Sequence, residues 1–151
     1  MSLDGRFVAF RSNASDLVAS DTNGADDVFV HQFELDTTAP KVVGVVPARG
    51  ASGVSGAINL KATFSEPVYD VKKNFKLYPK DSNRPVGARV TPVGGTNNKV
   101  WVLNPNRRLR VGTLYTAKVG TGVEDKVGRA LDQDRTKSRN QPMQWSFKTR
   151  R

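Results

Sequence analysis

Short runs in which apolar and polar residues alternate recur along the chain, and glycine, proline and asparagine separate them. In the segment INLKATF at 58–64, every second residue is apolar. A period of two is typical of a strand with one buried face, because successive side chains point to opposite sides of a sheet. This segment is therefore predicted to be a half-buried strand.

The same criterion predicts a regular series of strands bounded by turn residues. The predicted strands cover residues 6–10, 27–33, 41–46, 58–64, 74–78, 86–93, 99–103, 113–119 and 144–148. Seven of them follow residue 40, and no segment shows a helical period, which favours an all-β, two-sheet sandwich. The first two strands predict only a β-hairpin or a partly disordered arm. The charged stretch 132–141 is predicted to be a long exposed loop.

The periodicity leaves the inward face of two strands open. In 113–119, either Leu114 or else Tyr115, Ala117 and Val119 face the core. In 99–103, either Val100 and Val102 or Trp101 and Leu103 face the core. The final strand is less ambiguous, because its two aromatic residues alternate with polar ones and supply a large apolar anchor.

Charge divides the chain into two parts. Residues 1–36 carry two basic and seven acidic residues, a net of −5, whereas residues 37–151 carry 22 basic and seven acidic residues, a net of +15. The boundary lies at Asp-Thr-Thr-Ala-Pro, and proline favours extended backbone before it. We expect residues 1–36 to be a fragment of another unit, 37–41 a linker, and 42–151 the main domain.

Composition excludes several classes of function. The chain has no cysteine and one histidine, His31, so a zinc site or a histidine-based catalytic triad has little to draw on. No phosphate-binding loop is present, and no apolar run is long enough for a membrane span. The first residues show no apolar core of a signal peptide. We expect a chain without catalytic residues and without a bound cofactor.

Five blocks resemble, in order and spacing, the bacterial Ig-like domains first described in S-layer proteins. They are TAPKVVGVVPARGASGV at 38–54, INLKATFSEPV at 58–68, VWVLNP at 100–105, LRVGTLYTAKVGTGVEDKVGRAL at 109–131 and WSFKT at 145–149. DGRFVAF and SDLVASDTNGADDVFV, within 4–33, resemble one repeat of the TolB-like, WD-like β-propellers. The resemblance implies a seven-stranded immunoglobulin-like β-sandwich preceded by a fragment of a propeller repeat.

This resemblance implies a non-catalytic structural or spacer module of a multidomain, exported bacterial protein in the envelope or outside the cell. Its partners would be neighbouring domains of the parent protein, and we expect a monomer. One alternative is a module that binds cell-wall polymers, glycans or other polyanions through a basic surface. Another is an accessory domain of a larger exported enzyme.

Two groups of acidic residues are candidate calcium sites, because calcium prefers several oxygen ligands. The first is a loop in the acidic part, which also fits a polar turn closed by its own side chains. Its candidate ligands are Asp21, Asn23, Asp26 and Asp27. The second rests on the resemblance, since tandem surface domains of this kind often stiffen their linkers with calcium. It comprises Asp36, Glu66 and Asp125.

Two basic clusters are candidate polyanion sites, although a solvated basic surface explains them as well. They comprise Arg107, Arg108 and Arg110, and Arg135, Lys137 and Arg139. No aromatic residues are interleaved with them, and no nucleic-acid motif is present, so we expect no sequence-specific nucleic acid as a partner. Any such binding would be electrostatic and would weaken with salt.

Overall fold

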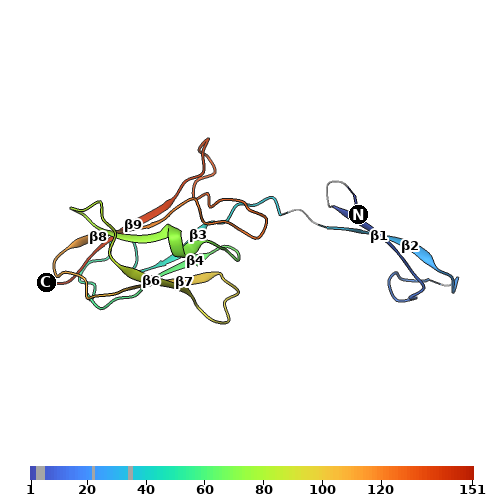
Figure 1. Cartoon of the computed structure of the whole chain (residues 1–151), viewed down its shortest axis with the longest axis horizontal. Helices are drawn as coiled ribbons and strands as arrows, with labels where there is room; N and C mark the ends of the chain where they lie inside the picture. Colours follow the sequence, from blue (N-terminus) through green and yellow to red (C-terminus); the bar gives the residue numbers. More distant parts are fainter. Residues whose placement is uncertain (3–5, 22, 34–35) are drawn as a thin grey trace. The chain divides into compact units, whose positions relative to one another are not determined.

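The chain divides into two compact units, Met1–Thr37 and Thr38–Arg151 (Figure 1). Each unit is a separate β structure with its own strand pairing. The computed structural model describes residues 1–2, 6–21, 23–33 and 36–151.

The first unit contains two antiparallel strands, β1 (Phe7–Ser12) and β2 (Asp27–Gln32). Phe10 and Phe29 are partners in the register, and their rings stack with centroids 5.6 Å apart. None of the described residues of this unit is buried, and Val28 is 74% exposed. The predicted pair of strands is confirmed, but a pair this small has almost no core of its own.

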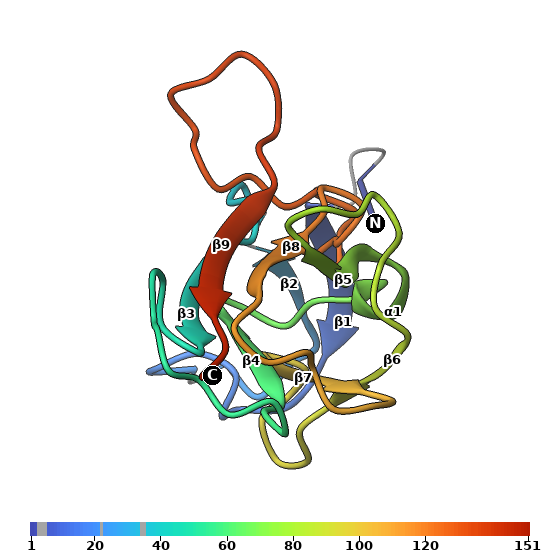
Figure 2. The ribbon, with the colours of Figure 1, turned by 90° about the vertical axis from the view of Figure 1, so that its left-hand side faces the viewer.

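The second unit is the predicted β-sandwich, with its two sheets face to face (Figure 2). Each pairing within the sheets is antiparallel. The described residues of this unit form seven strands. One sheet has the order β3 (Val42–Val46), β4 (Leu60–Phe64), β7 (Val100–Pro105), β6 (Ala88–Pro92), and the other has the order β5 (Phe75–Pro79), β8 (Leu114–Val119), β9 (Met143–Lys148).

The core lies between the two sheets and follows the alternation of apolar residues. In β7, Trp101 and Leu103 are buried, which resolves the open choice of face for this strand. In β9, Met143, Trp145 and Phe147 are each no more than 3% exposed. Each inward side chain therefore leaves water for a packed interior, which is the main stabilising term of such a fold.

A single helical turn between β4 and β5 is not anticipated by the sequence pattern. It is α1 (Val71–Asn74), which follows Asp70 in the left-handed region at φ 55° and buries Val71 completely. Among the described residues, no helix is long and apolar enough to cross a membrane.

The stretch 132–141, predicted to be exposed, is partly buried at its base. Asp132 is 9% exposed, and its Oδ1 accepts hydrogen bonds from the amides of Asp134 (3.2 Å) and Gln141 (3.1 Å). The side chain of Gln133 also pairs with both backbone polar groups of Val42, at 2.9 and 3.1 Å. The prediction is wrong for Asp132. Its carboxylate can be buried because backbone amides of the loop donate hydrogen bonds to it.

Candidate cation and anion sites

The second candidate calcium site comprises three acidic side chains, Asp36, Glu66 and Asp125. One carboxylate oxygen from each of Asp36, Glu66 and Asp125 lies within 4.8 Å of the others. Glu66 follows β4, and Asp125 lies in the turn after β8. Asp36 belongs to the segment that leads into the sandwich. Asp125 is only 4% exposed, whereas the other two are half-buried.

A tight turn fixes the Asp125 carboxylate. Its Oδ1 accepts hydrogen bonds from the amides of Val127 (2.8 Å) and Arg129 (2.9 Å), and the Asp125 amide donates to the Arg129 carbonyl at 3.0 Å. The turn passes through Gly128 at φ 81°, a conformation that side-chain-bearing residues rarely adopt.

A second contact fastens this turn to the segment after Glu66. The amide of Tyr69 donates to the carbonyl of Glu124 at 2.8 Å, and Val68 beside it is fully buried. This backbone hydrogen bond fixes the segment after Glu66 against the turn that carries Asp125. Asp36 and Glu66 also have interaction partners of their own.

The other oxygen of Asp125 is the unusual atom of this cluster. Oδ2 is buried and has no hydrogen-bond partner among the residues that the structure describes. A buried charged oxygen without a partner is costly, and native proteins satisfy most such groups with a donor, water or an ion. Together with two further carboxylates, this oxygen suits a hard divalent cation such as calcium.

The acidic loop of the first unit is arranged differently. The Asn23 side chain donates to both carboxylate oxygens of Asp27, at 3.2 and 3.3 Å, and Asp21 accepts from the Asn23 amide at 3.3 Å. Asp26 forms an ion pair with Arg11 at 2.6 Å. These are the contacts of a polar turn closed by its own side chains, and calcium at this loop stays a prediction.

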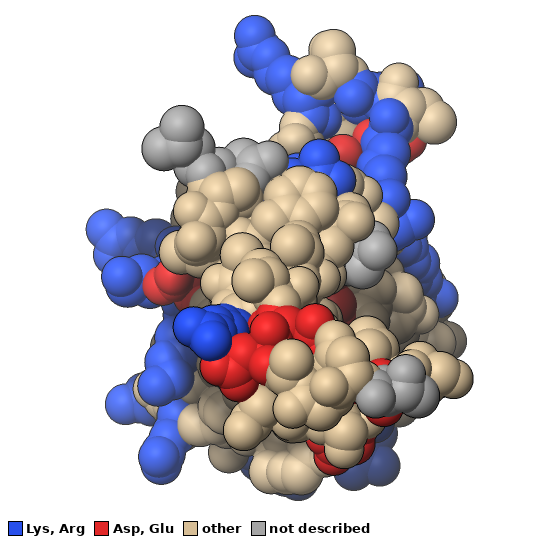
Figure 3. Space-filling view, turned by 90° about the vertical axis from the view of Figure 1, so that its right-hand side faces the viewer, with Lys and Arg blue, Asp and Glu red and all other residues tan. Residues whose placement is uncertain are grey.

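Charge is unevenly distributed over the surface. Figure 3 shows one face, on which the densest group of Asp and Glu side chains occupies one area while Lys and Arg are spread over several. One of the two predicted basic clusters lies in the loop after Asp132, and one of its residues makes a structural hydrogen bond. Arg135 donates to the carbonyl of Ala39 at 2.6 Å, and Lys137 and Arg139 are exposed.

An acidic residue lies inside this same loop. The Thr136 hydroxyl donates to Asp134 at 2.6 Å and the Thr136 amide donates to it at 3.1 Å, and these bonds lower the pKa of Asp134 below its ordinary value. Lys137 lowers this pKa further through its charge. Arg135 and Lys137 of the second basic cluster are therefore engaged in local contacts.

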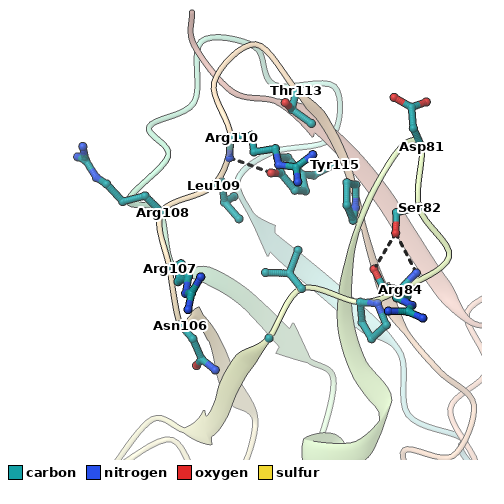
Figure 4. Close-up of a pocket in the computed structure, with 14 residues that line it drawn as sticks. Asp81, Ser82, Arg84, Asn106, Arg107, Arg108, Leu109, Arg110, Thr113 and Tyr115 are labelled. Carbon is teal, nitrogen blue, oxygen red and sulfur yellow. Dashed lines mark hydrogen bonds between the residues drawn. The ribbon is translucent and has the colours of Figure 1, made fainter.

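The first basic cluster lines a pocket of about 580 Å³. Figure 4 shows Arg107 and Arg110 on one side, with Arg84 of the β5–β6 loop on the other, and Arg108 pointing away. The pocket is bounded by Pro79, Asp81, Ser82, Arg84, Pro85, Val86, Gly87, Asn106, Arg107, Arg108, Leu109, Arg110, Thr113 and Tyr115. Sequence reasoning misses Arg84 and Tyr115, because neither adjoins the basic cluster along the chain.

Hydrogen bonds hold the arginine-bearing segment in place. The Asn106 amide donates to the carbonyl of Gly87 at 2.8 Å, which joins the two walls of the pocket. The Thr149 hydroxyl donates to the Arg110 carbonyl at 2.6 Å, and the Arg110 amide donates to the Tyr115 hydroxyl at 2.9 Å. The pocket is therefore formed by anchored backbone rather than by loose loops.

Comparison with known families identifies the second unit. The bacterial Ig-like domain family matches residues 36–149, so the chain belongs to this family. The match begins at Asp36 and includes the whole acidic cluster as well as the arginine pocket. A search of curated proteins found no significant match.

Solved structures share the fold at low sequence identity. Domains 1–6 of the surface layer protein SbsC align with 76% of this chain at 19% identity and a TM-score of 0.51, and the aligned part is 14% of that chain. CopC from Methylosinus trichosporium OB3b aligns with 74% of this chain and 93% of its own at 15% identity and a TM-score of 0.53. PcoC from Escherichia coli, a methionine-rich copper resistance protein, aligns with 75% of this chain and 100% of its own at 22% identity and a TM-score of 0.50. These identities support the shared fold alone.

Proposed function

We propose that this chain is part of a multidomain protein of the bacterial envelope or exterior, in which the Ig-like domain is a non-catalytic spacer. The family match, and the similarity of the fold to domains of a surface layer protein, support this role. The partners of such a spacer are the domains before and after it. We further propose that residues 1–36 derive from a neighbouring β-propeller repeat.

The acidic cluster gives the spacer a mechanical role. Asp36 lies where the chain enters the Ig-like domain, whereas Glu66 and Asp125 belong to the body of the sandwich. A calcium ion held by all three would connect the entering segment to the domain. The observation that carries this proposal is the buried Asp125 Oδ2, which has no hydrogen-bond partner among the described residues.

Calcium suits this cluster better than magnesium or a transition metal. All three side chains offer oxygen, and histidine and cysteine are absent from the group. Calcium accepts irregular sets of carboxylate, carbonyl and water ligands, whereas magnesium requires nearly octahedral geometry. The remaining positions would be filled by water and backbone carbonyls.

The test is a calorimetric titration of the whole chain with calcium, followed by the same titration of Asp125→Asn. Asparagine retains an oxygen for the amides of Val127 and Arg129 but removes the charge. We expect calcium affinity to fall at least tenfold. A matched control is Asp70→Asn, because Asp70 is exposed and its left-handed conformation is one that asparagine tolerates.

Two results would contradict the calcium proposal. One is that the unaltered chain takes up no calcium at millimolar concentration. The other is that both variants lose affinity equally, because the response would then follow net charge rather than a site. The fluorescence of the two buried tryptophans, Trp101 and Trp145, checks that each variant is folded.

A further inference from the structure

The arginine pocket carries positive charge that the protein leaves unneutralised. Among the described residues, no ion pair engages the guanidinium groups of Arg84, Arg107 or Arg110. The lining contains a single carboxylate, Asp81, against four arginines. A cleft lined by one sign of charge focuses its field and raises the local concentration of opposite charge.

Tyr115 adds a buried polar group to this pocket. Its side chain is 3% exposed, and its hydroxyl accepts the Arg110 amide proton at 2.9 Å. A phenol is both an acceptor and a donor, so the hydroxyl proton remains for a second partner. Because Tyr115 lines the cavity, that proton is available to an anionic acceptor in the pocket (Figure 4).

The pocket is also larger than an inorganic anion needs. Its volume of about 580 Å³ lies within the range of small-molecule sites, which is roughly 300–1,000 Å³. Apolar groups of Val86 and Leu109 form part of the lining, and Ser82 and Asn106 supply polar groups. The lining is thus mainly polar with a smaller apolar part, which suits a ligand that carries both charge and hydroxyl groups.

We propose that the arginine pocket binds a sugar phosphate, whose phosphate contacts the guanidinium groups of Arg84, Arg107 and Arg110. Guanidinium groups match phosphate oxygens in geometry and stay charged at every physiological pH. The sugar ring lies against Val86 and Leu109, and its hydroxyl groups reach the polar side chains. This site is independent of the calcium proposal, because it shares no residue with the acidic cluster.

The anchored backbone explains why the arginines can act together. Gly56 lies so close to the arginine-bearing segment that a Cβ on it would come within 2.7 Å of the Leu109 carbonyl oxygen. The Leu109 amide also donates to the Gly56 carbonyl at 2.8 Å. The backbone between Arg107 and Arg110 is thus held at its middle, which limits the entropy lost when a ligand binds.

The test is a calorimetric titration of the whole chain with glucose 6-phosphate, glucose and inorganic phosphate, each at low and high salt. We expect glucose 6-phosphate to bind most tightly and to lose affinity as salt rises. Binding of glucose with equal affinity would overturn the role of the arginines. Equal affinity for inorganic phosphate would overturn the role of the apolar lining.

Matched variants separate a site from a general charge effect. Arg107→Ala with Arg110→Ala removes two charges from the pocket, and we expect the dissociation constant to rise at least tenfold. Lys137→Ala with Arg139→Ala removes two charges from residues that do not line it, and we expect a change within twofold. Equal losses in the two double variants would overturn the proposal, and tryptophan fluorescence verifies that both are folded.

Discussion

The Phe147→Ala substitution tests whether the stability of the sandwich rests on the core described above. Phe147 is fully buried in β9, and its ring stacks on that of Tyr115 in β8, with centroids 5.9 Å apart. These two residues are also direct partners in the strand register. Truncation removes the buried ring and leaves a cavity between the sheets.

The expected magnitude follows from comparable core truncations. Replacing a buried phenylalanine by alanine costs about 3–5 kcal/mol. With a urea dependence of about 2 kcal/mol per molar for a domain of this size, the unfolding midpoint is expected to fall by about 2 M. The loss is a large part of the roughly 5–15 kcal/mol by which domains are usually stable.

Tryptophan fluorescence during urea unfolding measures this change selectively. The chain has two tryptophans, and Trp101 and Trp145 are both buried in the sandwich. A matched control is Val28→Ala in β2, because Val28 is 74% exposed and belongs to the other unit. We expect this control to change the free energy of unfolding by less than about 0.5 kcal/mol. A small shift for Phe147→Ala, or equal shifts for both variants, would refute this view of the core.

Two further predictions concern the pocket backbone and the exposed loop. Gly56→Ala is expected to destabilise the sandwich by about 1–3 kcal/mol in urea unfolding, because its Cβ would meet the Leu109 carbonyl. Gly94→Ala is the control and should not destabilise the sandwich, because a Cβ at Gly94 would meet open space. Equal effects of the two variants would contradict the close approach of Gly56 to Leu109. In an NMR titration, the pKa of Asp134 is expected below the ordinary value of an aspartate and to rise in Thr136→Ala, because that variant removes the side-chain hydrogen bond. The stabilisation from this carboxylate is present at neutral pH and is lost as the pH falls through that lowered pKa, and an unchanged pKa in Thr136→Ala would contradict the cause.

The sequence predicts the sandwich well because its strands have one buried face. Alternation in 58–64 identifies Leu60, Ala62 and Phe64 as inward residues, and all three are buried. For β7 the same signal is ambiguous, because apolar residues occupy both faces of the strand. The choice of Trp101 over Val100 depends on which face meets the other sheet, and that is a tertiary property.

Local polar stretches are less predictable. The helical turn α1 is too short to show an amphipathic period, and no side chain of a described residue caps it with a hydrogen bond. Asp132 looks solvated in a charged stretch, but amides from both sides of the loop donate to it. Its burial depends on a closure of the loop that no local pattern encodes.

The two candidate sites differ in how far the sequence leads to them. The acidic cluster follows from a resemblance, which places Glu66 and Asp125 near one pole of the fold. The sequence predicts only part of the arginine pocket. Arg84 comes from another loop, and the pattern around Tyr115 predicts only an aromatic residue of the core. Neither pattern reveals the Asp125 Oδ2, which is buried without a hydrogen-bond partner among the described residues because of the geometry of one turn.

The most direct test of the spacer account is the backbone dynamics of the entering segment, measured by ¹⁵N NMR relaxation with and without calcium. We expect calcium to raise the order parameters of the amides at 36–39 toward about 0.85, the value of rigid backbone. We also expect Asp125→Asn to abolish this change. Order parameters that do not respond to saturating calcium, or that rise equally in Asp125→Asn, would contradict the claim that the acidic cluster stiffens the entrance to the Ig-like domain.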